Sequence, residues 1–212
     1  MTLFSRRRAV FTHSGRDMKD RDLCFIDIET TGALFGFHEV IEVAAIRTSS
    51  DANRVLGTWH RRIRPEHPER FSAEARRING YDGQLWVGAQ ASNEHLWLEF
   101  ATFVQGCVPV CHNPAFDRAF LALAAIQCGI AELGLDYHWI GTESLAWPLY
   151  WTGDVQRLSL DCLCTFLGID AETTPHTALA GARTCMNVYR GLMAKIAISP
   201  SRGRVTGLRA DC

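Results

Sequence analysis

Residues 22–28 form a run that is apolar on both sides, and this run constrains the fold more than any other stretch of the chain. In an extended conformation alternate side chains point to opposite faces, so apolar residues occupy both faces here. A strand of this kind is typical of the centre of a sheet that is covered on both sides. We therefore expect a central strand at these positions.

Two carboxylates, Asp27 and Glu29, interrupt the apolar pattern at the end of this strand. They are two residues apart and so emerge on the same face. Neighbouring carboxylates repel each other and resist desolvation, so they need a shared cation to stay ionised. Oxygen ligands of this type suit Mg²⁺ or Mn²⁺. The alternative is a strand that simply ends, with the two acids at the start of a turn.

A second polar group follows a short apolar strand at residues 107–111. Asn113 and Pro114 are typical of a helix start, with asparagine as the cap and proline at the first helical position. Asp117 then falls in the first turn, where the helix dipole favours a negative charge. Either this preference alone explains Asp117, or the helix directs it across the sheet toward Asp27 to complete a cation cage.

These motifs resemble those of a known family, the DEDDh 3′–5′ exonucleases. This DnaQ-like group includes the proofreading subunits of polymerases. The resemblance covers roughly residues 22–195. It is carried by Asp27-Ile28-Glu29-Thr30-Thr31-Gly32, by His112-Asn113 with Phe116-Asp117, and by His176 before a helix.

The resemblance implies a ribonuclease H-like fold and a two-metal-ion hydrolysis of the terminal phosphodiester of single-stranded DNA or RNA. Asp27 is then expected to bridge two Mg²⁺ or Mn²⁺ ions, with Glu29 on one ion and Asp117 on the other side. His176 is expected to act as the general base for water. The residues expected to contact substrate are Thr30, Thr31, Leu34, His112, Asn113 and Phe116.

The third motif departs from the family pattern at Gly181. In the family an aspartate, the fourth metal-binding acid, stands five positions after the histidine. With three acids instead of four, we expect one of the two ions to bind weakly and the activity to be reduced or abolished. The alternative is a catalytically inactive module of the same fold that binds nucleic acid or associates with a polymerase.

An apolar loop at residues 33–37 follows the first motif and has a glycine at each end. In the family this loop lies beside the last bases of the bound strand, so Leu34 or Phe35 is expected to press on a base. The alternative is that these side chains tuck under a neighbouring helix.

The element order predicts an α/β domain with a five-stranded mixed sheet flanked by helices. Residues 1–20 are expected to form a flexible basic arm, residues 21–196 the exonuclease domain, and residues 197–212 a flexible tail. The predicted strands are 22–28, 38–47, 54–64, 107–111 and 137–140. The predicted helices are 71–79, one from about 92 to Gly106, 115–128, 160–167 with Ser159 as cap, and one after His176. Residues 142–151 are expected to form only a loose helical turn, broken by Pro148.

Composition limits where the chain works and what it binds. With 212 residues and 47% hydrophobic content it can bury one good core. A net charge of −1 excludes a broad basic coat for nucleic acid. The resemblance implies single-stranded 3′ ends and a DNA polymerase subunit as the expected partners. Eight cysteines without a C-x-x-C pair indicate buried thiols in a reducing compartment. Without an apolar run of about twenty residues, we expect a cytoplasmic protein with no membrane partner.

Overall fold

A computed structural model describes residues 17–84, 86–171 and 175–198 of the chain. Its centre is a five-stranded mixed sheet in the order β3-β2-β1-β4-β5. β1 pairs with β2 antiparallel and with β4 parallel, so it lies in the middle of the sheet, as predicted. The strands are β1 (Leu23–Thr30), β2 (Val40–Thr48), β3 (Val55–Arg62), β4 (Val108–Cys111) and β5 (Ile140–Gly141).

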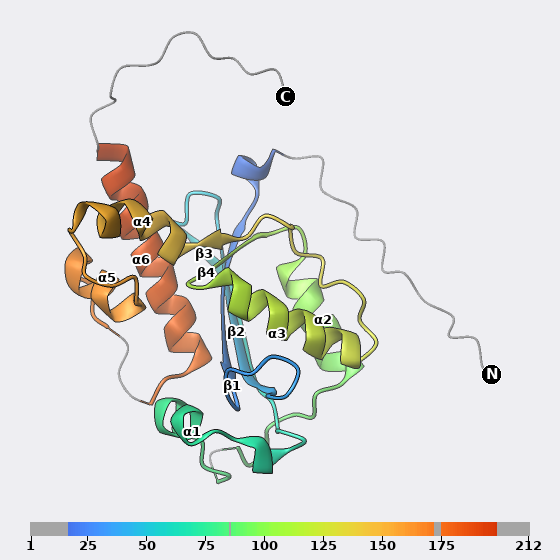
Figure 1. Cartoon of the computed structure of the whole chain (residues 1–212). Helices are drawn as coiled ribbons and strands as arrows, with labels where there is room; N and C mark the ends of the chain where they lie inside the picture. Colours follow the sequence, from blue (N-terminus) through green and yellow to red (C-terminus); the bar gives the residue numbers. More distant parts are fainter. Residues whose placement is uncertain (1–16, 85, 172–174, 199–212) are drawn as a thin grey trace.

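Helices cover both faces of the sheet (Figure 1). One face carries α6, with α4 and α5 outside it, and the other face carries α2 and α3. α1 lies at the end of the sheet near the start of α6. The helices are α1 (Ala73–Asn79), α2 (Glu94–Val104), α3 (Pro114–Gln127), α4 (Thr142–Thr152), α5 (Leu160–Leu167) and α6 (Ala178–Ile198), with short 3₁₀ helices η1 (Met18–Asp20) and η2 (Pro68–Arg70).

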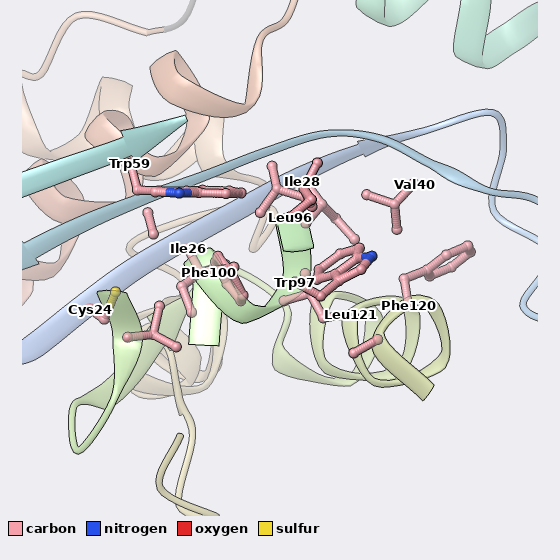
Figure 2. Close-up of a cluster of buried hydrophobic side chains, with 14 of the residues drawn as sticks. Cys24, Ile26, Ile28, Val40, Trp59, Leu96, Trp97, Phe100, Phe120 and Leu121 are labelled. Carbon is pink, nitrogen blue, oxygen red and sulfur yellow. The ribbon is translucent and has the colours of Figure 1, made fainter. Parts of the chain in front are cut away.

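The two faces of β1 have separate cores. Cys24, Ile26 and Ile28 pack with residues of α2 and α3, in the cluster drawn in Figure 2. Leu23 and Phe25 point the other way and pack against α6. The predicted central strand with two covered faces is therefore confirmed, and α6 lies on the face that also carries Asp27 and Glu29.

α4 is an eleven-residue helix with Pro148 inside it, so the prediction of a loose turn was wrong. Proline removes one backbone hydrogen bond from a helix interior and normally breaks it. Here the helix is stabilised by packing, because Ala146 is buried in a cluster shared with α5 and α6. The hydroxyl of Thr152 also donates a hydrogen bond to the Pro148 carbonyl, at 3.0 Å. Tertiary contacts thus outweigh the local preference.

One smaller expectation differs from the structure, and two N-cap predictions are confirmed in position only. β5 is only Ile140–Gly141, because Asp136 accepts hydrogen bonds from the amide and the ring of His138 and holds that segment in a turn. Asn113 and Ser159 stand at the N-cap positions of α3 and α5, but neither side chain makes a capping hydrogen bond. Pro114 does occupy the start of α3, as predicted.

The folded region extends beyond both predicted limits. η1 places residues 18–20 in an ordered 3₁₀ turn before position 21, and α6 continues past position 196 to Ile198. The rest of the predicted arm and tail, residues 1–16 and 199–212, lies outside the described residues. The seven cysteines that the structure describes are free thiols, and five of them are buried, as predicted, while Cys128 and Cys162 are only partly buried. None of the described helices combines the length and apolar character needed to cross a bilayer.

Candidate active site

The candidate site lies at the carboxyl end of β1. Asp27 and Glu29 are half-buried there, and a β-bulge follows directly after Glu29. Bulges are frequent beside active sites because they redirect the side chains around them. β1 and β4 are parallel, so both strands end at this edge, where α3 begins. The carboxyl ends of strands are the usual position of ligands in α/β sheets.

Asp117 lies in the first turn of α3 and is buried, with 5% of its surface exposed. Burial raises the pKa of this carboxyl group to about 7. Its carboxylate also accepts a hydrogen bond from the thiol of Cys111 at the end of β4. An acid in this environment is costly to ionise unless a cation lies nearby.

Asp27 and Asp117 both act electrostatically on two buried thiols, Cys111 and Cys185. Burial and both carboxylate charges raise the pKa of Cys185 on α6 well above its ordinary value. The same causes, with the hydrogen bond that the thiol donates to Asp117, raise the pKa of Cys111. One acid from β1 and one from α3 therefore lie within electrostatic range of Cys111 and Cys185.

His176 precedes α6 and is tied to the other end of the site through α1. Its backbone N–H donates to the carbonyl of Ile78, at 2.9 Å. The next residue of α1, Asn79, donates from Nδ2 to the carbonyl of Thr30, at 3.1 Å. Thr30 directly follows Glu29, so α1 joins the end of β1 to the segment that carries His176. This arrangement brings the first and third motifs to one region.

Gly181 lies on α6 against Asp27. A Cβ atom built at Gly181 would be 2.3 Å from Oδ2 of Asp27 and 2.7 Å from its Cγ. The backbone at Gly181 is ordinary helix, with its N–H donating to the carbonyl of Thr177 at 2.9 Å. The absence of a side chain at Gly181 therefore leaves space for the Asp27 carboxylate. The backbone conformation at this position does not itself require glycine.

The predicted three-carboxylate cage is not closed in this structure. Among the residues described, no three His, Cys, Asp or Glu side chains are gathered closely enough to hold one metal ion. Asp27 lies against α6 in the space beside Gly181, which accounts for part of this difference. A cation shared by Asp27, Glu29 and Asp117 would therefore require these side chains to rotate.

Thr30 and Thr31, predicted to contact substrate, are both buried. The Thr30 hydroxyl donates to the carbonyl of Gly32, at 2.8 Å, and the Thr31 hydroxyl accepts from the N–H of Glu39, at 2.9 Å. Their hydroxyl groups thus hold the loop between β1 and β2 in shape. This loop presents the neighbouring apolar side chains.

Leu34 and Phe35 in that loop are exposed, by 64% and 56%. The alternative in which they tuck under a helix is therefore wrong. Phe35 touches α3 only with its ring, which meets Phe120 edge to face at a centroid distance of 5.9 Å. Phe116 packs on the same Phe120 ring, at 4.7 Å. A chain of aromatic contacts through the buried Phe120 therefore links the loop to the residue before Asp117.

A cleft of about 440 Å³ opens between this loop and the second half of α3. Phe37, Arg64 and Arg70 are among the residues that line it. The guanidinium of Arg70 lies over the Phe37 ring, 5.1 Å from its centroid. Arginine beside an exposed aromatic ring is a combination found in grooves that bind single strands.

His112 is held at the start of α4. Its Nδ1 lies 2.9 Å from the hydroxyl of Thr142, and its carbonyl accepts from the N–H of Glu143. Burial lowers the pKa of His112, which favours the neutral ring. Asn113 is exposed at the start of α3. The structure thus assigns His112 a supporting contact, while Asn113 is open to solvent.

Sequence reasoning missed two buried polar residues beside the site, Asn79 and Glu42. Asn79 precedes the glycine that ends α1, an ordinary helix ending that gives no functional signal. Glu42 interrupts an otherwise apolar strand, which was the available signal. Its neighbours become visible only once the strand register is known.

The mixed sheet with helices on both faces is the ribonuclease H-like fold. A solved structure of E. coli exonuclease I, in a zinc-bound complex with single-stranded DNA, superposes with a TM-score of 0.69. The identity is 14%, over 82% of this chain and 41% of that one, so the likeness concerns the fold.

Residues 24–189 match the model of the exonuclease family RNase_T. The chain belongs to this exonuclease family, and its resemblance to the DEDDh group is confirmed. It is 29% identical over 173 residues to the DNA polymerase III subunit epsilon of Pasteurella multocida, covering 77% of this chain and 65% of that protein. It is 26% identical to the PolC-type DNA polymerase III of Caldanaerobacter subterraneus, covering 80% of this chain. The chain spans only 11% of that second relative.

Proposed function

We propose that the chain is a 3′–5′ exonuclease that hydrolyses the terminal phosphodiester of single-stranded DNA or RNA. The observation that carries this proposal is the position of Asp27 and Glu29 at the carboxyl end of β1, with the buried Asp117 in the first turn of α3 after the parallel strand β4. Membership of the exonuclease family supports it. The single-stranded DNA in the exonuclease I structure indicates the kind of substrate.

The site fits divalent cations by the chemistry of its donors. Asp27, Glu29 and Asp117 supply carboxylate oxygens, which suit Mg²⁺ or Mn²⁺. A cation would also relieve the cost of ionising the buried Asp117. When bound, a pair of such ions activates water and stabilises the leaving 3′ oxygen.

The remaining chemistry falls to His176. We assign it the role of general base, because an imidazole side chain can take a proton from water during hydrolysis. The hydrogen bond from its backbone N–H to the carbonyl of Ile78 holds the backbone of His176 in place. α1 therefore acts as the support for the base.

Substrate binding is assigned to the apolar loop and the cleft beside it. Leu34 and Phe35 are exposed and would press on the last bases of the strand. Arg64 and Arg70 line the adjoining cleft and would pair with the backbone phosphates of upstream nucleotides. Phe116, packed on the same ring as Phe35, would complete the apolar wall next to Asp117.

We propose that Gly181 weakens the activity. Losing a residue that only supports a metal ligand typically costs about 10- to 100-fold in affinity or activity, and losing a ligand should cost at least as much. The open arrangement of the three acids agrees with this. It also favours a second candidate, an inactive module that binds single strands or a DNA polymerase. The polymerase names of the relatives suggest that partner.

A comparison with Asp27→Ala distinguishes the two candidates. Shortening of a labelled single strand is measured in Mg²⁺ and in Mn²⁺, and binding of the same strand is measured by fluorescence anisotropy. The exonuclease predicts metal-dependent shortening that Asp27→Ala loses. If both proteins bind the strand but neither shortens it, the binding module is correct.

The free cysteines suit the reducing cytoplasm, where we place the protein.

A further inference from the structure

Glu42 is a buried acid that the proposed reaction does not use. It lies on β2, directly opposite Glu29 on β1, and the two strands are antiparallel. Side chains of directly opposite residues share one face of the sheet, with Cβ atoms about 4.5–5.5 Å apart. Glu42 is 0% exposed, so its carboxylate is enclosed by protein next to a predicted cation ligand.

A histidine and an arginine from β3 face this acid. His60 Nε2 lies 2.5 Å from Oε1 of Glu42, and Arg62 Nε lies 3.8 Å from the same oxygen. Both reach Glu42 from the solvent side, since their side chains are 33% and 36% exposed. In the strand register Arg62 is the direct partner of Glu42. The row across the sheet is therefore Glu29, Glu42 and Arg62.

The second oxygen of Glu42, Oε2, is not paired by any of the described residues. Oε2 is buried and makes no hydrogen bond within the part of the chain that the structure describes. A buried oxygen without a partner is costly, so its presence needs a reason. A carboxylate directly opposite another carboxylate adds to this cost. Both costs would be relieved by a cation beside Glu29.

We propose that Glu42 is a positioning residue of the cation site. Its charge, held in place by His60, lies beside Glu29 and raises the affinity of this edge of the sheet for a divalent cation. The charge acts through space, and Glu42 need not coordinate the ion. This partly offsets the missing acid at Gly181. The inference rests on the proposed function, because it assigns the ion of that site.

The test is a titration with Mn²⁺ alone, followed by electron paramagnetic resonance. Glu42→Gln keeps the shape and removes the charge, and it should raise the Kd for Mn²⁺ at least about fivefold. Glu42→Asp keeps the charge and should stay within about threefold of the unchanged protein. Glu99→Gln is the matched control, because Glu99 on α2 also pairs with a cation from β3, Arg61, at 3.1 Å. This variant should change the Kd by less than twofold.

A second measurement separates charge from folding. In EDTA, Glu29→Gln should raise the melting temperature of the unchanged protein by more than it raises that of the Glu42→Gln variant. The reason is that Glu42→Gln has already removed the repulsion between the two carboxylates. If Glu42→Gln does not fold, Glu42→Gln/His60→Gln removes both members of the pair and gives the same readouts.

Each outcome decides the inference. If Glu42→Gln binds Mn²⁺ like Glu99→Gln, or if the two Gln substitutions are additive in EDTA, Glu42 has no part in the cation site. That result leaves the proposed function intact. If the unchanged protein binds no Mn²⁺ at all, the proposed function fails, and the inference fails with it.

Discussion

Gly181 on α6 provides the space that the carboxylate of Asp27 occupies. A Cβ at Gly181 would lie 2.3 Å from Oδ2 of Asp27, closer than two such atoms can approach. A family aspartate at this position and Asp27 in its present position are therefore mutually exclusive. The site is not a four-acid site with one acid deleted, because Asp27 has taken up part of the vacated space.

This contact predicts that Gly181→Ala shifts the melting temperature in opposite directions in the unchanged protein and in the Asp27→Ala variant. Gly181→Ala should lower the melting temperature of the unchanged protein in EDTA, because the new methyl group displaces Asp27. In Asp27→Ala the same substitution should raise it, since alanine favours a helix interior over glycine by about 1 kcal/mol. For a chain of this size that gain is about 2–4 °C. Differential scanning calorimetry of the four proteins measures both shifts.

The control for this cycle is Gly191→Ala on the same helix. Its Cβ would meet the end of the Leu167 side chain at 3.0 Å, far along α6 from Asp27. Its effect should be the same in both backgrounds. Equal shifts for Gly181→Ala in both backgrounds would show that Asp27 does not depend on this space.

Burial of Asp117 predicts that the metal-free protein loses stability as the pH rises. The folded pKa of about 7 lies above the ordinary value of 3.8, so between these values the folded state holds a proton that the unfolded state has released. The contribution is fully present below about pH 4 and is lost as the pH passes 7. Urea unfolding in EDTA at pH 5 and pH 8 should show this loss. Asp117→Asn should reduce the difference; an unchanged difference would place its origin elsewhere.

Asn79 predicts a link between α1 and the site. Asn79→Ala removes the hydrogen bond to the Thr30 carbonyl and the one that its Oδ1 accepts from the N–H of Tyr81. Leaving these buried groups unpaired should cost about 1–3 kcal/mol of unfolding free energy. Cleavage should fall about 10- to 100-fold, as for residues that support metal ligands. Asn53→Ala, in the exposed turn before β3, is the control for both assays. Lost stability with unchanged cleavage would limit Asn79 to a structural role.

Phe35 predicts a loss of substrate binding without a loss of stability. Phe35→Ala should weaken single-strand binding by about 1–3 kcal/mol, the usual contribution of one aromatic–base stack. Because the Phe35 side chain is mostly exposed, the unfolding free energy of the protein should change by less than about 0.5 kcal/mol. Trp151→Ala, an exposed aromatic residue at the end of α4, should leave binding unchanged. Equal effects of the two substitutions would indicate general apolar adhesion.

The sequence predicted the features that depend on local pattern. The apolar residues on both faces of the strand around Asp27 predicted the central strand, and Pro114 predicted the start of α3. Features that depend on distant contacts were missed. Pro148 led to the wrong prediction that the helix breaks there. The packing of Ala146 against distant helices, which stabilises α4, cannot be read from the neighbouring residues of the sequence.

The same limit applies to the candidate site. The spacing from His176 identified Gly181 as the departed position, but its close approach to Asp27 depends on how α6 crosses β1. Glu42 became a candidate only when the register set it opposite Glu29 and His60 reached it from β3. Residues that act across strands therefore require the structure.

The most direct test of the central claim follows the direction and metal dependence of cleavage on one labelled strand. A single strand with a 5′ label should shorten stepwise from its 3′ end in Mn²⁺, release mononucleotides, and remain intact in EDTA. Asp27→Ala, Glu29→Gln and Asp117→Asn should each abolish this shortening. Shortening that persists in all three variants, or an unchanged protein that never shortens the strand in Mn²⁺ or Mg²⁺, would contradict the assignment of these acids to a nuclease site.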